Sequence, residues 1–168
     1  TKYFIKNKLK YPTIVVGSSL GGWISLVVSQ KPNKKIKGII GIGTAPDFTE
    51  NILKSLSLQE KEKYKKNKFL SFSSKYTKEK FIFTKNFIDD SKKYLILKKK
   101  INTESIVSLL YGSKDAAVSL DNQLKILELL NAKSSKLIIV KNSDHRMSSK
   151  KDLILLKRTI KNMIKDIL

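Results

Sequence analysis

One short motif constrains this chain more than any other feature of its sequence. A β-branched run at residues 13–16 leads directly into a Gly-x-Ser-x-Gly motif at residues 17–21, with Ser19 at its centre. A serine at the tip of so sharp a strand-to-helix turn is forced into a strained backbone conformation. Gly17 and Gly21, two residues before and after it, are expected to keep the strand and the helix from colliding. The motif therefore predicts that the Ser19 hydroxyl stands clear of the sheet, as in a nucleophile elbow.

The residues after Ser19 have the spacing of a helix, expected over residues 19–30. Apolar side chains recur at Leu20, Trp23, Ile24, Val27 and Val28. The positive end of this helix would lie at the serine, where the Leu20 backbone N–H can stabilise a developing oxyanion. The alternative is a glycine-rich turn without chemistry. A phosphate-binding loop is excluded because no Lys-Ser/Thr pair follows the glycines, and their spacing does not fit the dinucleotide-binding motif.

Length and cysteine content limit the class of protein. The chain has 168 residues, which fits one domain with a hydrophobic core. It contains no cysteine, which excludes disulfides, a thiol nucleophile and cysteine-based metal sites. No apolar run approaches the roughly 18 residues that span a bilayer, so no transmembrane segment is expected. This composition is compatible with a reducing cytoplasm.

The charge of the chain is strongly positive, but its pattern favours a solvated surface. The formal net charge is +21, and only two of the 35 basic side chains, Arg146 and Arg158, are arginines. Nucleic-acid readers usually depend on arginine for bidentate and stacking contacts. The lysines are also spread along the chain. We therefore expect weak attraction to polyanions and no specific nucleic-acid partner.

Three further apolar runs predict strands at residues 36–42, 106–112 and 136–140. Near-continuous apolar runs are typical of parallel strands that are covered on both faces. Residues 44–103 interrupt this pattern and are too long for a structureless loop, so we expect a helical cap or lid there. Its aromatic side chains either line an acyl pocket or, as we favour, pack the cap onto the body. The prediction is one α/β domain over residues 1–168, with about four parallel strands, flanking helices and a cap insert.

Three reactive side chains follow three of the predicted strands. Ser19, Asp115 and His145 would lie at the carboxyl edge of the sheet, where open α/β sheets place their sites. Their order along the chain is the order of the catalytic triad in α/β-hydrolases. His145, the only histidine, would take the proton of the Ser19 hydroxyl, and Asp115 would orient the imidazole. Asp144 and Asp47 are alternative acids, but the first is adjacent to His145 and the second is more remote.

The same segments carry a family resemblance. Residues 17–23, 111–115 and 143–147 together resemble the mitochondrial palmitoyl-protein thioesterases of the α/β-hydrolase-domain group and their bacterial relatives. The similarity extends over nearly the whole chain and includes Ser74-Lys75-Tyr76 in the insert. The Ser-Asp-His-Arg-Met string at residues 143–147 is more discriminating than the Gly-x-Ser-x-Gly motif.

The resemblance implies an α/β-hydrolase fold and a serine esterase or thioesterase activity. Ser19, Asp115 and His145 then correspond to nucleophile, acid and base, and no metal or organic cofactor is required. The family hydrolyses S-acyl thioesters and some carboxylic esters, including acyl glucuronides, so the expected partner is a small-molecule or protein-linked acyl substrate. The expected compartment is the cytoplasm of a bacterium or the mitochondrion of a eukaryote.

The chain differs from the family at its amino-terminal end. Several strands precede the motif in the family, and the loop after the third supplies the other oxyanion N–H. We therefore expect a carboxy-terminal portion of a longer hydrolase, whose first strand, at residues 13–17, is an edge strand. Two alternatives remain open: a basic module that binds polyanions on a hydrolase-like body, and a catalytically silent hydrolase-like fragment.

Overall fold

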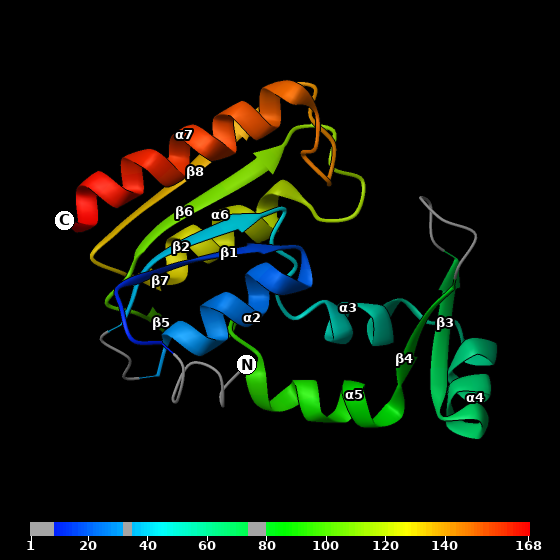
Figure 1. Cartoon of the computed structure of the whole chain (residues 1–168). Coiled ribbons are helices and arrows are strands. Elements are labelled where there is room, and N and C mark those ends of the chain that lie inside the picture. Colours follow the sequence, from blue (N-terminus) through cyan, green and yellow to red (C-terminus); the bar gives the residue numbers. More distant parts are fainter. Residues whose placement is uncertain (1–8, 32–34, 74–79) are drawn as a thin grey trace. The chain divides into compact units, whose positions relative to one another are not determined.

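A computed structural model describes residues 9–31, 35–73 and 80–168 of the chain (Figure 1). The segment Ser74-Lys75-Tyr76, which contributes to the family resemblance, lies outside these residues. The described residues form two compact units. Residues 47–95 make up one unit, and the segments on either side of them make up the other.

A four-stranded parallel sheet is the centre of the unit formed by the two flanking segments. Its strands, in spatial order, are β1 (Thr13–Ser18), β2 (Ile36–Ile42), β6 (Ile106–Gly112) and β8 (Ser134–Val140). The four predicted strands are confirmed, although β8 begins earlier than residue 136. Because all four run in the same direction, their carboxyl ends meet at one edge of the sheet.

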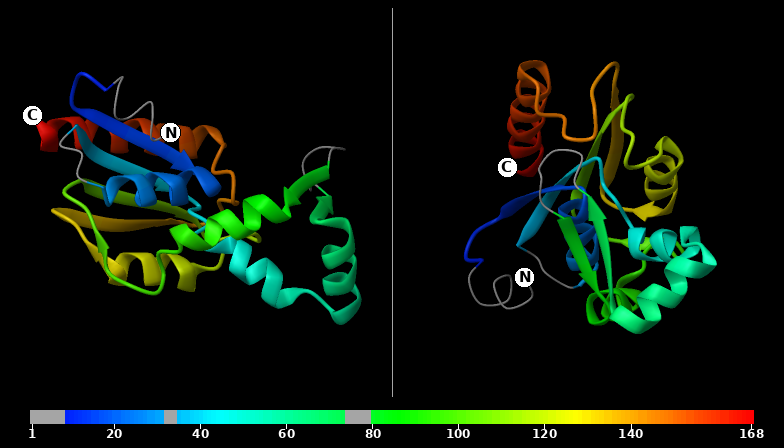
Figure 2. Two further views of the ribbon diagram at one scale, coloured as in Figure 1. Left: turned by 90° about the horizontal axis from the view of Figure 1, so that it is seen from below. Right: turned by 90° about the vertical axis from the view of Figure 1, so that its right-hand side faces the viewer.

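Helices cover both faces of this sheet. The long helix α7 (Lys150–Ile167) lies on one face, and α2 (Leu20–Ser29) and α6 (Leu120–Leu129) lie on the other (Figure 1 and Figure 2). Met163 of α7 packs with Ile40, Ile42, Ile106 and Leu110 of the strands. Both faces of β2 are covered, which is why six of its seven residues are buried and why its sequence is nearly continuous in apolar residues.

The strand β1 lies at an edge of the sheet, as expected. Within the described residues it pairs only with β2, and Val16 keeps 44% of its surface exposed. A second, short parallel ladder joins β5 (Ile101–Asn102) to β7 (Leu130–Asn131). Among residues 9–31, 35–73 and 80–168, no helix is long and apolar enough to cross a membrane.

The insert contains the expected helices and also a pair of strands that was not predicted. It contains α3 (Phe48–Ser55), α4 (Leu58–Asn67), α5 (Lys85–Ser91) and the short 3-10 helix η1 (Lys92–Tyr94), but also an antiparallel pair formed by β3 (Phe69–Ser73) and β4 (Lys80–Thr84). The two strands place Leu70 opposite Phe83 and Phe72 opposite Phe81. Aromatic side chains favour strands when they find such cross-strand partners, and this outweighs helix propensity here.

The aromatic side chains of residues 47–95 pack among themselves. The Phe48 and Phe83 rings meet edge to face with their centroids 5.4 Å apart, and the Phe83 and Phe87 rings stack at 5.7 Å. Leu56, Leu70 and Ile88 form the buried centre beside them. This unit therefore has an apolar core of its own.

The glycines in and directly after the Gly-x-Ser-x-Gly motif differ in how much space there is for a side chain. A Cβ on Gly17 would lie 2.3 Å from the Gly21 carbonyl oxygen, so strand and helix approach closely only because Gly17 has no side chain. A Cβ on Gly21 would meet nothing within 4 Å, so the expectation that Gly21 must also be small is wrong. Gly22 is the second restricted position, because its Cβ would lie 2.4 Å from the Thr44 hydroxyl.

We predict opposite effects for two matched substitutions in the 168-residue chain. Gly17→Ala forces β1 and α2 apart and should lower the free energy of unfolding by about 1–3 kcal/mol. Gly21→Ala adds a better helix former in open space and should leave stability unchanged or raise it by up to about 1 kcal/mol. Urea denaturation measures both. Equal losses for the two variants would contradict the packing described for this turn.

Candidate active site

Ser19 lies between β1 and α2 in a backbone conformation with a positive φ. Its φ is 52° and its ψ is −118°, which is strained for a residue with a side chain. Its N–H donates to the Ile42 carbonyl oxygen at 2.8 Å, and its own carbonyl accepts the N–H of Gly22 at 3.0 Å. The structure thus has the sharp strand–turn–helix geometry that the motif predicts.

Leu20 is the first residue of α2, directly after the turn. The first N–H groups of a helix have no partner within it and carry the positive end of its dipole. An anion beside the Ser19 side chain would therefore meet a favourable field. Donation by the Leu20 N–H to an oxyanion stays a prediction.

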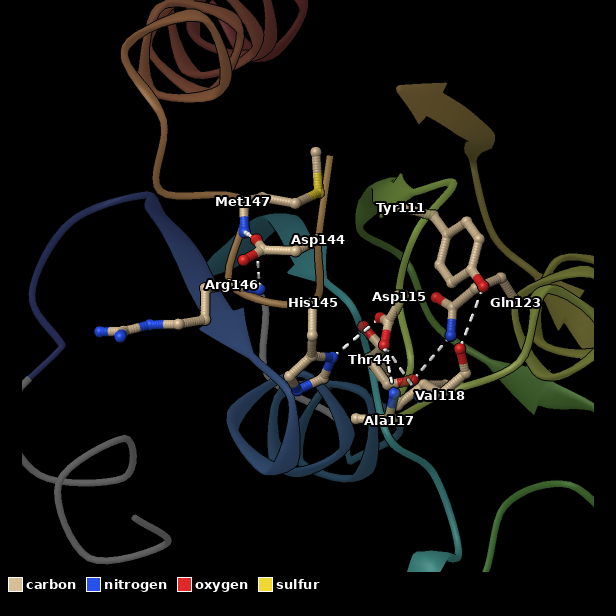
Figure 3. Close-up of polar contacts among 10 residues, drawn as sticks. All are labelled: Thr44, Tyr111, Asp115, Ala117, Val118, Gln123, Asp144, His145, Arg146 and Met147. Atoms are coloured by element: carbon tan, nitrogen blue, oxygen red, sulfur yellow. Dashed lines mark hydrogen bonds and ion pairs between the residues drawn. The ribbon is translucent and has the colours of Figure 1, made fainter. Parts of the chain in front are cut away.

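Asp115 follows β6, and its carboxylate is fully engaged. One oxygen, Oδ1, accepts the backbone N–H groups of Ala117 at 2.8 Å and Val118 at 2.9 Å. The other, Oδ2, lies 2.8 Å from Nδ1 of His145 (Figure 3). The Asp115 side chain has no exposed surface, and that of His145 is 14% exposed. The structure therefore brings these two predicted residues together.

Opposing effects set the acidity of Asp115. Burial raises the pKa of the carboxyl group, because it disfavours the charged form. Hydrogen bonds from His145, Val118 and Ala117 act against burial and outweigh it, so the pKa lies below its ordinary value. An ionised carboxylate only accepts hydrogen bonds, so Nδ1 of His145 carries the hydrogen and Nε2 is the basic nitrogen.

His145 lies in the loop after β8, which is built around Asp144. The carboxylate oxygen Oδ1 of Asp144 accepts the N–H groups of Arg146 at 3.1 Å and Met147 at 3.0 Å. Met147 is buried and has a positive φ of 45°. In Figure 3 the side chain of Arg146 points away from the Asp115–His145 pair. Asp144, the alternative acid, therefore shapes the loop that presents His145.

The other alternative acid, Asp47, belongs to the unit formed by residues 47–95. It is buried, and it precedes the first residue of α3 with a positive φ of 54°.

A hydrogen bond that was not predicted from the sequence joins the loop after β8 to α7. The hydroxyl of Ser143, two residues before His145, donates to the Asp152 carboxylate at 2.5 Å. Asp152 also accepts from Ser149, and the two form a capping box at the start of α7. Burial raises the pKa of Asp152, but the hydrogen bonds from Ser143 and Ser149 lower it below its ordinary value. The Ser-x-x-Asp spacing of residues 149–152 was the signal for this cap.

The loop after β2 connects Ser19 to the Asp115–His145 pair. Ile42, the last residue of β2, accepts the Ser19 N–H, and Ala45 of the loop donates its N–H to the Ser19 carbonyl oxygen at 3.1 Å. Gly43 lies between them with a φ of 47°. A Cβ on Gly43 would lie 3.0 Å from Nδ1 of His145 and 3.1 Å from Oδ2 of Asp115. The three predicted residues thus border one short loop at the carboxyl edge of the sheet.

Among the residues that the structure describes, no three His, Cys, Asp or Glu side chains lie close enough together to hold a metal ion. The polar groups at this edge are a hydroxyl, an imidazole, a buried carboxylate and a helix N-terminus. Such a set is able to activate a nucleophile and to stabilise an anion.

We predict that Asp115→Asn lowers the free energy of unfolding by about 1–3 kcal/mol at pH 7, because an amide NH2 replaces one acceptor oxygen. The folded-state pKa of Asp115 lies below its unfolded value, so the ionised carboxylate stabilises the fold at neutral pH. That contribution is lost as the pH falls from about 5 through the folded-state pKa. Denaturation from pH 7 to pH 3 should show the difference from the wild type shrinking. Asp166→Asn, which alters an exposed carboxylate near the end of α7, is the control.

Comparisons with known proteins identify relatives of this chain. No model of a known protein family matches the chain. The chain is 31% identical over 154 residues to palmitoyl-protein thioesterase ABHD10, mitochondrial, of Homo sapiens, covering 91% of this chain and 50% of that protein. The protein of the same name from Rattus norvegicus is 32% identical, covering 91% of this chain and 52% of that protein. The chain spans about half the length of these curated relatives.

Two solved structures share the fold. A hydrolase from Agrobacterium vitis has a TM-score of 0.83 and 32% identity, covering 90% of this chain and 60% of that chain. Alpha/beta hydrolase domain-containing protein 10 from mouse has a TM-score of 0.88 and 29% identity, covering 99% of this chain and 67% of that chain. The chain is therefore part of an α/β-hydrolase fold, related to the mitochondrial palmitoyl-protein thioesterase ABHD10 and to a bacterial hydrolase.

Proposed function

We propose that this chain forms the catalytic part of a serine hydrolase that cleaves acyl esters or acyl thioesters. The observation that carries the proposal is the 2.8 Å contact between His145 and the buried carboxylate of Asp115, at the same sheet edge as the strained Ser19. A basic nitrogen oriented by a buried acid is what a serine hydroxyl requires to become a nucleophile.

The proposed reaction has two halves. Nε2 of His145 takes the proton of Ser19 as its hydroxyl oxygen attacks the acyl carbonyl carbon, and the negative charge gathers on the carbonyl oxygen near the Leu20 N–H. The alcohol or thiol then leaves with the proton from His145, and the acyl group stays on Ser19 as an ester. Water attacks this ester with His145 again as base, releasing the carboxylic acid and restoring the serine.

Asp115 has an electrostatic part in this proposal. The imidazole becomes positively charged whenever it holds the serine proton, and a carboxylate at 2.8 Å stabilises that charge. Burial raises the pKa of Asp115, but hydrogen bonds from His145 and from the backbone N–H groups of Val118 and Ala117 lower it by more, so the carboxylate stays ionised at neutral pH and keeps the hydrogen on Nδ1. The basic nitrogen of the ring is then always Nε2.

The names of the relatives suggest a substrate class. ABHD10 is named a palmitoyl-protein thioesterase, so we propose a long-chain acyl thioester or ester as the substrate. The relatives are also named mitochondrial, and in a eukaryotic cell we propose that compartment for this protein.

We predict that a fluorophosphonate probe labels the natural protein on Ser19, because it mimics the tetrahedral state of an acyl transfer. Ser19→Ala should abolish labelling, and Asp115→Asn should slow it by about 10⁴-fold, the loss in kcat that replacing the triad aspartate by asparagine causes in a serine protease. Asp166→Asn, which alters an exposed carboxylate near the end of α7, serves as the control. Peptide mass spectrometry locates the label.

Probe labelling, combined with a measurement of nucleic-acid binding, distinguishes the proposed enzyme from the alternative of a polyanion-binding module. With a net charge of +21, binding to nucleic acid should be weak, independent of base sequence and steeply reduced by salt. Absence of labelling together with salt-resistant, sequence-selective binding would overturn the proposed hydrolase.

A further inference from the structure

We propose that Gln123, on α6, is a positioning residue that holds the backbone of Ser19 through the peptide bond between Thr44 and Ala45. The inference rests on the proposed function, because it assigns Gln123 a part in presenting the proposed nucleophile. Nothing in the sequence marked Gln123, since it lies among the leucines of an amphipathic helix.

Gln123 is fully buried and makes one long-range polar contact. Its Nε2–H donates to the Thr44 carbonyl oxygen at 2.7 Å, from a residue far away in the sequence (Figure 3). Only the amide nitrogen can donate to a carbonyl, so the orientation of the amide is fixed. Thr44 is itself fully buried in the loop after β2. The contact thus ties α6 to the loop that borders the candidate site.

The other side of the same peptide bond contacts Ser19. The Ala45 N–H donates to the Ser19 carbonyl oxygen at 3.1 Å. A peptide unit is planar, so the Thr44 carbonyl and the Ala45 N–H turn together. Gln123 therefore fixes the direction in which Ala45 donates, although it does not contact the serine itself.

Ser19 needs such support because its backbone is strained. Strained conformations persist only when the surrounding structure over-determines them. The Ser19 N–H is held by Ile42, and its carbonyl is held by Ala45 and by Gly22 in the first turn of α2. If Ala45 were released, one of these restraints on the turn would disappear.

The cost of burying Gln123 also points to a role beyond stability. Its Oε1 has no hydrogen-bond partner among the described residues, and neither has the hydroxyl of Thr44. A buried acceptor that is left unsatisfied lowers the stability of the fold. A methionine would fill a similar volume without that cost, so packing alone does not require a glutamine here.

The test compares Gln123→Met with a matched control in the natural protein. Ser105→Ala removes another buried side-chain donor, which donates to the Ile36 carbonyl oxygen at 2.9 Å at the opposite end of β2. We measure the rate constant of fluorophosphonate labelling per folded molecule, together with kcat and KM on a p-nitrophenyl ester. Gln123→Met should slow labelling and kcat by about 10–100-fold with KM unchanged, because the nucleophile is displaced. Ser105→Ala should leave labelling unchanged.

A conservative variant provides the rescue. Gln123→Glu keeps the length of the side chain, and its carboxyl group donates to the Thr44 carbonyl only when it is protonated. The labelling rate of Gln123→Glu relative to Gln123→Met should therefore rise as the pH is lowered. Labelling of Gln123→Met at the wild-type rate, or of Gln123→Glu no faster than Gln123→Met at the lowest pH, would overturn the proposal.

Amide hydrogen exchange separates this inference from the proposed function. Gln123→Met should speed exchange of the Ala45 N–H, and Ser105→Ala should not. This readout does not depend on catalysis, whereas loss of the proposed function would appear as a wild-type protein that the probe does not label at Ser19. Unchanged exchange of the Ala45 N–H in Gln123→Met would contradict the proposal that Gln123 holds the peptide bond between Thr44 and Ala45.

Discussion

The candidate site depends on the hydrogen bonds that Ser19 makes with the end of β2 and with the loop after it. Ser19 has a φ of 52°, and a residue with a side chain does not hold that conformation without restraint. Ile42 at the end of β2 accepts its N–H, and Ala45 in the loop donates to its carbonyl, so β2 and the loop together hold the turn from both sides. The pairing of β1 with β2 places this loop beside the turn, because the register sets Ser18 opposite Ile42.

The Asp115–His145 pair shows how local turns prepare a site. Each residue follows its strand in a loop whose backbone N–H groups bond to a carboxylate: Asp115 in one loop and Asp144 in the other. The two loops are also joined, because Lys114 donates its N–H to the Ser143 carbonyl oxygen at 2.9 Å. Gly112 permits this approach, since a Cβ there would lie 2.4 Å from backbone oxygens of Ser143 and Asp144. Two loops far apart in sequence therefore behave as one support.

The lysines described here, which contribute to the positive charge of the chain, lie on exposed surfaces. The lysine-dense run of residues 61–68 forms much of α4, a helix with no buried residue. Other lysines pair locally, and hydrogen bonds from Lys85 and Lys92 lower the pKa of Asp89 to about 2. These side chains are exposed, and exposed pairs contribute little to stability. Their placement agrees with a solvated surface.

The sequence by itself determined the parallel strands and the turn at Ser19, because both follow from local patterns: continuous apolar runs, and glycines at fixed spacing around a serine. It also predicted Asp115 and His145 at strand ends, and the tertiary structure brought these two together. Their contact needs strand register and loop geometry, which no local pattern specifies. Only the tertiary structure decided that residues 69–73 and 80–84 form an antiparallel pair of strands, since cross-strand partners select them. The contacts of Gly22 and Gln123 with Thr44 and of Ser143 with Asp152 likewise join separate elements, and apolar periodicity carries no information about them.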